Sequence, residues 1–64
     1  MIMVGFKTVN STYYVDQINN TITGGIFKDN KYRYLEIQAL IGRNGLVKLE
    51  NGRVIRTGII KRYI

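Results

Sequence analysis

The side chains that most often carry catalysis are scarce in this chain. It contains neither His nor Cys, so the usual pairs of nucleophile and base cannot be assembled. The common thiolate and imidazole ligands of a zinc site are missing for the same reason. Among the four carboxylates, Asp16 and Glu36 could form an acid/base or Mg²⁺ pair, but ordinary surface acids are the expected case. We therefore expect no enzymatic activity, no metal and no cofactor.

Cations and tyrosines are the remaining candidates for chemistry. Lys31 and Arg33 flank Tyr32 and Tyr34, and small barrels bind single-stranded nucleic acid with aromatic rings beside cations. Exposed Tyr on a sheet more commonly packs across strands or contacts a partner subunit, so both interpretations stay open. Other cations could extend this surface toward phosphates or toward an acidic protein. The candidate partner-binding residues are Lys31, Tyr32, Arg33, Tyr34, Arg43, Arg53, Arg56, Lys61 and Arg62.

Charge is distributed unevenly along the chain. Residues 1–30 contain two cations and two acids, whereas residues 31–64 contain eight cations and two acids, so the net charge of +6 lies in the second half. Such asymmetry favours an anionic partner, either nucleic acid or an acidic protein surface. The competing interpretation is a solvated face that keeps the protein in solution.

Length and composition predict one small domain over residues 1–64. A chain of 64 residues lies near the lower limit for unaided folding, and without Cys it has no disulfide framework. The opening MIMVGF lacks the basic region of a signal peptide, and no apolar run approaches the ~20 residues of a membrane span. We expect a soluble, cytoplasmic protein that does not contact membranes.

Turn signals divide the chain at intervals of about ten residues, with β-favouring segments between them. These signals are Asn10-Ser11, Asn19-Asn20, Asp29-Asn30, Asn44-Gly45 and Asn51-Gly52. They predict strands over residues 2–9, 12–18, 21–28, 31–41, 46–50 and 53–57. The expected fold class is all-β, a six-stranded antiparallel meander forming a small SH3-like or OB-like barrel, in which the long strand 31–41 could serve both halves.

Asn51-Gly52 predicts a two-residue type I′ hairpin turn, because both positions of this turn need a positive φ. The turn would place Glu50 opposite Arg53 and Arg56 opposite Val47. Arg56 would then lie on the core side of the sheet, at the barrel rim, with its stem covering the core.

Alternation with a period of two predicts which side chains face the core. In the fourth strand Leu35, Ile37, Ala39 and Ile41 form an apolar stripe, which leaves Tyr32 and Tyr34 on the wet face. The other predicted core residues are Ile2, Val4, Phe6, Tyr13, Val15, Ile22, Ile26, Val47, Leu49 and Val54.

Two segments depart from simple alternation. Gly24-Gly25 predicts a bulge or sharp bend within the third strand. Residues 59–64 mix apolar and charged side chains on both faces of a strand, whereas one helical turn would place Ile59 with Tyr63 and Ile60 with Ile64. A short C-terminal helical turn is therefore expected, capped by Thr57.

Two stretches carry a family resemblance. Thr8-Val9-Asn10-Ser11-Thr12-Tyr13, and later Gly52-Arg53-Val54-Ile55-Arg56-Thr57, resemble hairpins of small uncharacterised β proteins encoded by bacteriophages and prophages. The resemblance implies a bacterial host cell and a protein that binds and modulates a host enzyme, a defence system or nucleic acid.

Two functions are therefore expected, in order of preference. The first is a phage-type modulator or inhibitor that docks on an acidic host protein, with arginines in ion pairs and tyrosines as anchors. The alternative is a nucleic-acid-binding barrel. In either case, exposed tyrosines and edge strands favour a homodimer.

Overall fold

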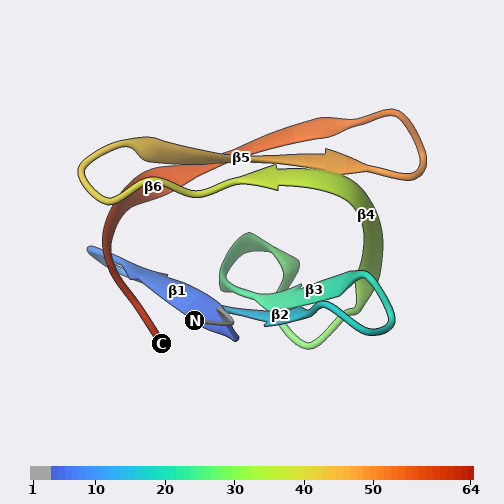
Figure 1. Ribbon diagram of the computed structural model, residues 1–64, viewed down its shortest axis with the longest axis horizontal. Helices are drawn as coiled ribbons and strands as arrows, with labels where there is room; N and C mark the ends of the chain where they lie inside the picture. Colours follow the sequence, from blue (N-terminus) through green and yellow to red (C-terminus); the bar gives the residue numbers. More distant parts are fainter. Residues whose placement is uncertain (1–3) are drawn as a thin grey trace.

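The turns of this chain separate six antiparallel strands that close into a barrel (Figure 1). The computed structural model describes residues 4–64. Each strand pairs with the next and β1 pairs with β6, so the expected all-β meander is confirmed. The elements are β1 (Gly5–Thr8), β2 (Thr12–Asp16), β3 (Thr21–Gly24), the 3-10 helix η1 (Gly25–Phe27), β4 (Tyr32–Gln38), β5 (Asn44–Leu49) and β6 (Val54–Tyr63).

Strands β4 and β6 each belong to both halves of the barrel. The first residues of β4 pair with β3, and the strand then pairs with β5 from Tyr34 onward. Likewise β6 pairs with β5 as far as Ile59 and with β1 from Ile60. Figure 1 shows the result, with β5 and its neighbours in one layer and β1, β2 and β3 in the other. The expectation that the long fourth strand serves both halves is confirmed.

A bulge between Tyr34 and Glu36 changes which side chains of β4 face the core. Because the extra residue interrupts the alternation, Leu35 is exposed and Tyr34 packs against the core. Ile37 and Ala39 pack there as predicted, whereas Ile41 lies exposed in the turn after the strand. The predicted apolar stripe is therefore confirmed for Ile37 and Ala39 and wrong for Leu35 and Ile41.

The β5–β6 hairpin has a three-residue loop rather than the predicted two-residue turn. Leu49 N–H donates to Arg53 O at 2.8 Å, and Gly52 N–H donates to Leu49 O at 3.0 Å. Only Gly52 of the loop has a positive φ, 91°, as in a type I turn followed by a left-handed glycine. The type I′ prediction, with Glu50 opposite Arg53, is wrong by one residue.

That single residue reverses the faces of β6. Val47 pairs with Ile55, and Leu46 pairs with Arg56. Since side chains alternate, Ile55 packs against the core, while Val54 and Arg56 are exposed on the outer face. The prediction that Arg56 lies on the core side opposite Val47 is therefore wrong.

Eight apolar side chains form the buried core: Phe6, Tyr13, Val15, Ile22, Phe27, Val47, Leu49 and Ile60. Six of them are predicted by alternation, and Phe27 and Ile60 are not. Five predicted core residues are exposed instead: Val4, Ile26, Leu35, Ile41 and Val54. The prediction for Ile2 lies outside the described residues.

The Gly24-Gly25 pair produces the expected bend and ends β3 at Gly24. Both glycines have a positive φ, 88° and 49°, and η1 follows directly. A Cβ on Gly25 would overlap the ring of Tyr13, whose hydroxyl accepts Ile26 N–H at 3.2 Å. The helix carries Phe27 into the core, where its ring lies edge-on to Tyr13 at 6.1 Å. The predicted strand 21–28 is thus too long.

No helical turn is present at the end of the described chain, because β6 continues to Tyr63. Register shifts occur between Asn44 and Leu46 and between Lys7 and Thr8. They bring Thr57, Ile60 and Tyr63 toward the core at intervals of three residues, a spacing that imitates a helix in the sequence. Tyr63 hydroxyl donates to Ala39 O at 2.6 Å and ties the end of β6 to the end of β4.

Candidate binding site

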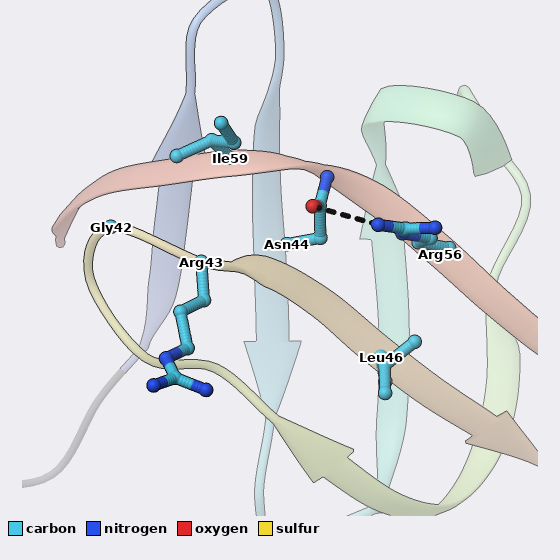
Figure 2. Close-up of a pocket in the computed structure, with 6 residues that line it drawn as sticks. All are labelled: Gly42, Arg43, Asn44, Leu46, Arg56 and Ile59. Carbon is cyan, nitrogen blue, oxygen red and sulfur yellow. Dashed lines mark hydrogen bonds between the residues drawn. The ribbon is translucent and has the colours of Figure 1, made fainter.

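A hollow of about 520 Å³ lies on the outer face of β5 and β6 (Figure 2). The β ladder builds it, because Leu46 pairs with Arg56 and Asn44 pairs with Ile59. The turn before β5 completes it. We call it the Arg43–Arg56 hollow, and it is lined by Gly42, Arg43, Asn44, Leu46, Arg56 and Ile59.

Hydrogen bonds fix the position of the Arg56 side chain. Asn44 Nδ2 donates to Thr57 O at 2.8 Å, which orients the amide so that its Oδ1 accepts Arg56 Nη2 at 3.2 Å. Figure 2 shows this contact as a dashed line between the Asn44 side-chain oxygen and the Arg56 guanidinium. The rest of the Arg56 guanidinium group stays available to a partner, since Arg carries five N–H donors.

The backbone around Arg43 is held equally firmly. Gly42 N–H donates to Ile60 O at 2.8 Å, and Ile60 N–H donates to Arg43 O at 2.9 Å, so the β4–β5 turn is attached to β6. Gly42 has a φ of 88°, a conformation that favours glycine in this turn. Both arginines therefore project from backbone that the sheet fixes.

No carboxylate lines the Arg43–Arg56 hollow. Within residues 4–64, neither arginine has a carboxylate within ion-pair distance, while Leu46 and Ile59 beside them are 37% and 43% exposed. Guanidinium groups bind carboxylates in a bidentate geometry, and their weak hydration suits them to interfaces. The hollow can therefore accept an acidic group next to an apolar one.

A shallower hollow of about 170 Å³ continues the same face and shares Leu46. Lys48 lies there between its cross-strand neighbours Glu36 and Val54. The outer face of β4, β5 and β6 thus carries apolar and cationic side chains together with the carboxylate of Glu36.

Lys31, Tyr32 and Arg33 form a separate group, in a hollow of about 280 Å³ at the β5–β6 loop. Arg33 Nε lies 3.4 Å from Glu50 Oε2, so this group is partly neutralised. The ring of Tyr32 leans on Phe27, with 5.1 Å between the ring centroids. One face of that ring is therefore occupied by the protein itself.

The prediction that Tyr32 and Tyr34 are both exposed is right for Tyr32, which is 36% exposed, and wrong for Tyr34. Tyr32 pairs with the buried Ile22, and Tyr34 is half-buried against the core. Burial raises the pKa of the Tyr34 hydroxyl, and the negative charge of Asp16 adds to that shift. The two tyrosines do not form the expected platform for stacking bases.

The other candidates are dispersed over the barrel. Arg53 lies at the start of the return from the β5–β6 loop, whereas Lys61 and Arg62 lie near the end of β6, where Arg62 pairs with Lys7 of β1. None of these three residues lines any of the three hollows described above. The nine predicted residues are thus divided between several surfaces.

Asp16 and Glu36, the acids that could have formed a pair, lie on β2 and β4, two strands that do not pair with each other. The described residues contain no group of three or more acids placed to hold a metal ion. Asp16 serves the β2–β3 turn instead, where its Oδ1 accepts Ile18 N–H at 3.0 Å and Asn19 N–H at 3.1 Å. Asn19 Nδ2 donates to Oδ2 at 2.9 Å, and these bonds lower the pKa of Asp16.

Asn44, Leu46 and Ile59 belong to the hollow but are not predicted as site residues. Asn44-Gly45 resembles a turn, yet β5 begins at Asn44 and Gly45 is buried in it. The turn lies earlier, where Arg43 N–H donates to Leu40 O at 3.1 Å. Gly42 is the sequence signal that could have located this turn.

No family model matches the chain, and no match to it was found among curated proteins or solved structures. In the part of the chain that the structure describes, no helix has the length and apolar character needed to cross a membrane. The fold and the site together define a small, closed β-barrel with a cationic hollow on one face.

Proposed function

We propose that this protein is a non-enzymatic binding protein that docks on an acidic surface of another protein. Its biological role would be that of a phage-type modulator or inhibitor of a bacterial host protein or defence system. The observation that carries the proposal is the Arg43–Arg56 hollow, in which two guanidinium groups without a carboxylate partner among residues 4–64 border exposed apolar side chains.

The chemistry of the hollow resembles that of protein interfaces. Arg is enriched at interface centres, where its stem packs and its planar group pairs with carboxylates. Because Asn44 already orients Arg56, less side-chain entropy is lost when a partner binds. A partner that offers a carboxylate beside an aliphatic or aromatic side chain would satisfy both parts of the hollow.

Nucleic-acid binding is the second candidate, and the net charge of +6 favours it. The stacking role expected of Tyr32 and Tyr34 loses support, because Tyr34 packs against the core and the exposed ring of Tyr32 already contacts Phe27. A nucleic acid would therefore be held mainly through its phosphates, with an affinity that falls steeply as salt is added.

A pull-down from bacterial host lysate, with and without nuclease, separates the two candidates. The bait is compared with an Arg43→Gln/Arg56→Gln variant and with a Lys61→Gln/Arg62→Gln variant, which removes the same charge outside the hollow. We expect one stoichiometric protein that survives nuclease, is lost with the first variant and is kept with the second. Recovery of nucleic acid alone, reduced equally by both variants, would contradict docking on a protein.

Self-association is a separate part of the proposal. A homodimer would cover exposed sheet edges and enlarge a small core. Sedimentation velocity at tens of micromolar tests it directly, and a monomer at that concentration would exclude a stable dimer.

A further inference from the structure

Strand β6 has an unpaired edge along its first half. Residues 54–59 pair with β5 on one side, and β1 joins the other side only at Ile60. The β1–β2 hairpin explains this limit, because Thr8 N–H donates to Ser11 O at 2.8 Å and the chain turns away. Within residues 4–64, the side of β6 before Ile60 therefore has no neighbouring strand.

Hydrogen-bond alternation identifies the residues that face this edge. Leu49 N–H donates to Arg53 O at 2.8 Å, so Arg53 and then Ile55 direct their main chain toward β5. Val54 and Arg56 direct their N–H and C=O groups the other way, where the described residues supply no strand. Such an edge is a template for an added strand.

A hollow of about 410 Å³ lies next to this edge, lined by the polar residues Thr8, Asn10 and Ser11 as well as by apolar ones. Gly58 and Ile59 of β6 line it together with Val9 of the β1–β2 turn and Ile26 of η1. Val9 and Ile26 are 62% and 55% exposed, although both are aliphatic. We call it the Val9–Ile26 hollow, and it can receive one apolar side chain from a strand that continues along β6.

Charge decides between the possible occupants. Residues 51–64 contain four cations and no acid, so a second copy that paired β6 with β6 would set cations against cations. Like charges opposite one another destabilise a strand pair, whereas opposite charges stabilise it. An extended segment that carries acids is the complementary occupant.

We propose that β6 binds an extended acidic segment of a partner protein by strand addition along Val54 and Arg56. Along the added strand, every second side chain would be acidic and would lie on the same side as the Arg56 guanidinium. The side chains between them would be apolar, and one of them would enter the Val9–Ile26 hollow. This inference rests on the proposed function, because it gives the docking mode of the same acidic partner.

Amide exchange measured by NMR tests the inference, with a capped synthetic peptide of alternating Glu and Val as the probe. In the free protein, the Val54 and Arg56 amides should exchange at unprotected rates, while the Ile55 amide, bonded to β5, exchanges slowly. Peptide binding should slow the first two about tenfold when about nine-tenths of the protein is bound, since exchange continues from the free fraction.

Two variants at one position provide the matched comparison. Val54→Pro removes an N–H that faces away from β5, so the ladder with β5 stays complete, whereas Val54→Thr keeps that N–H. Val54→Pro should weaken peptide binding about tenfold, the effect of one lost hydrogen bond, and Val54→Thr should leave it unchanged. If Val54→Pro does not fold, the exchange rates of the unmodified chain decide the question.

The outcomes separate this inference from the proposed function. Peptide binding that Arg43→Gln/Arg56→Gln weakens, without slower exchange at Val54 and Arg56, would overturn strand addition and leave the acidic partner in place. Slower exchange that persists in that double variant would support strand addition and remove the Arg43–Arg56 hollow from the binding site. No binding of the peptide, or protection of both amides by dimerisation of the free protein, would overturn the inference.

Discussion

The two halves of this chain use their large side chains differently. In residues 4–30 three aromatic rings pack together, with Phe6 stacked on Tyr13 at 5.0 Å and Phe27 edge-on to Tyr13. In residues 31–64 the eight cations lie at exposed positions of β4, β5 and β6 and of the loops next to these strands. The comparison teaches that the first half supplies the aromatic cluster of the core, whereas the second half supplies aliphatic core residues and also presents the cationic surface proposed to bind a partner.

The energies of aromatic contacts and of exposed ion pairs support this difference between the two halves. Aromatic pairs contribute about 0.5–1.5 kcal/mol each beyond the burial of their area. An exposed ion pair such as Arg33 with Glu50 contributes about 0–1 kcal/mol, because water and salt screen it. Changes in the aromatic cluster should therefore affect folding, and changes of outward cations should affect binding.

The largest expected effect is on the aromatic cluster. Gly25→Ala should lower the free energy of unfolding by about 2–5 kcal/mol, because the added Cβ overlaps Tyr13 and the φ of 49° disfavours alanine. Urea unfolding followed by circular dichroism measures this change. Gly42→Ala is the matched control, since it has a similar φ problem at 88° but open space around the Cβ.

The control should cost about 1 kcal/mol, the conformational part alone. Equal losses in the two variants would show that the contact between Gly25 and Tyr13 does not hold the first half together. The contrast between the two halves would then lose its main support.

The next effect concerns the β2–β3 turn and appears only in acid. Hydrogen bonds from Asn19 and Ile18 lower the pKa of Asp16 below its ordinary value of 3.8. A group whose folded pKa is depressed stabilises the fold above its unfolded pKa, so this contribution should fade as the pH falls below about 4. Asp16→Asn should be less stable than the unmodified chain at pH 7 and should show a weaker loss in acid.

Urea midpoints measured between pH 2 and pH 7 (about five steps) test this expectation. Glu36→Gln is the control, because it removes a carboxylate from the outer face of β4 rather than from a turn. A pH dependence that is unchanged in Asp16→Asn would assign acid sensitivity to other carboxylates.

The smallest expected effect on stability lies in the cationic half. Arg43→Gln/Arg56→Gln should change the free energy of unfolding by no more than about 0.5 kcal/mol, because both side chains are exposed and lack a carboxylate partner. Thermal unfolding measures it beside the binding tests above. A loss of more than about 1 kcal/mol would mean that these arginines support the fold. The proposed difference in role between the two halves of the chain would then fail.

The sequence by itself determines the class of fold and much of the core. Turn signals separate β-favouring segments, and simple alternation within β2 and β5 correctly places Tyr13, Val15, Val47 and Leu49 in the interior. These predictions succeed because each strand there keeps its period of two without interruption. The absence of His and Cys likewise limits the available chemistry, whatever fold the chain adopts.

The tertiary structure decides where that period is interrupted. One additional loop residue before Arg53 moves Arg56 to the outer face, and the bulge in β4 turns Tyr34 inward. Register shifts in β6 set Thr57, Ile60 and Tyr63 inward at a spacing that reads as helical in the sequence. A bulge or a loop length depends on partner strands distant in the chain, and a shift of one residue exchanges the two faces of everything that follows.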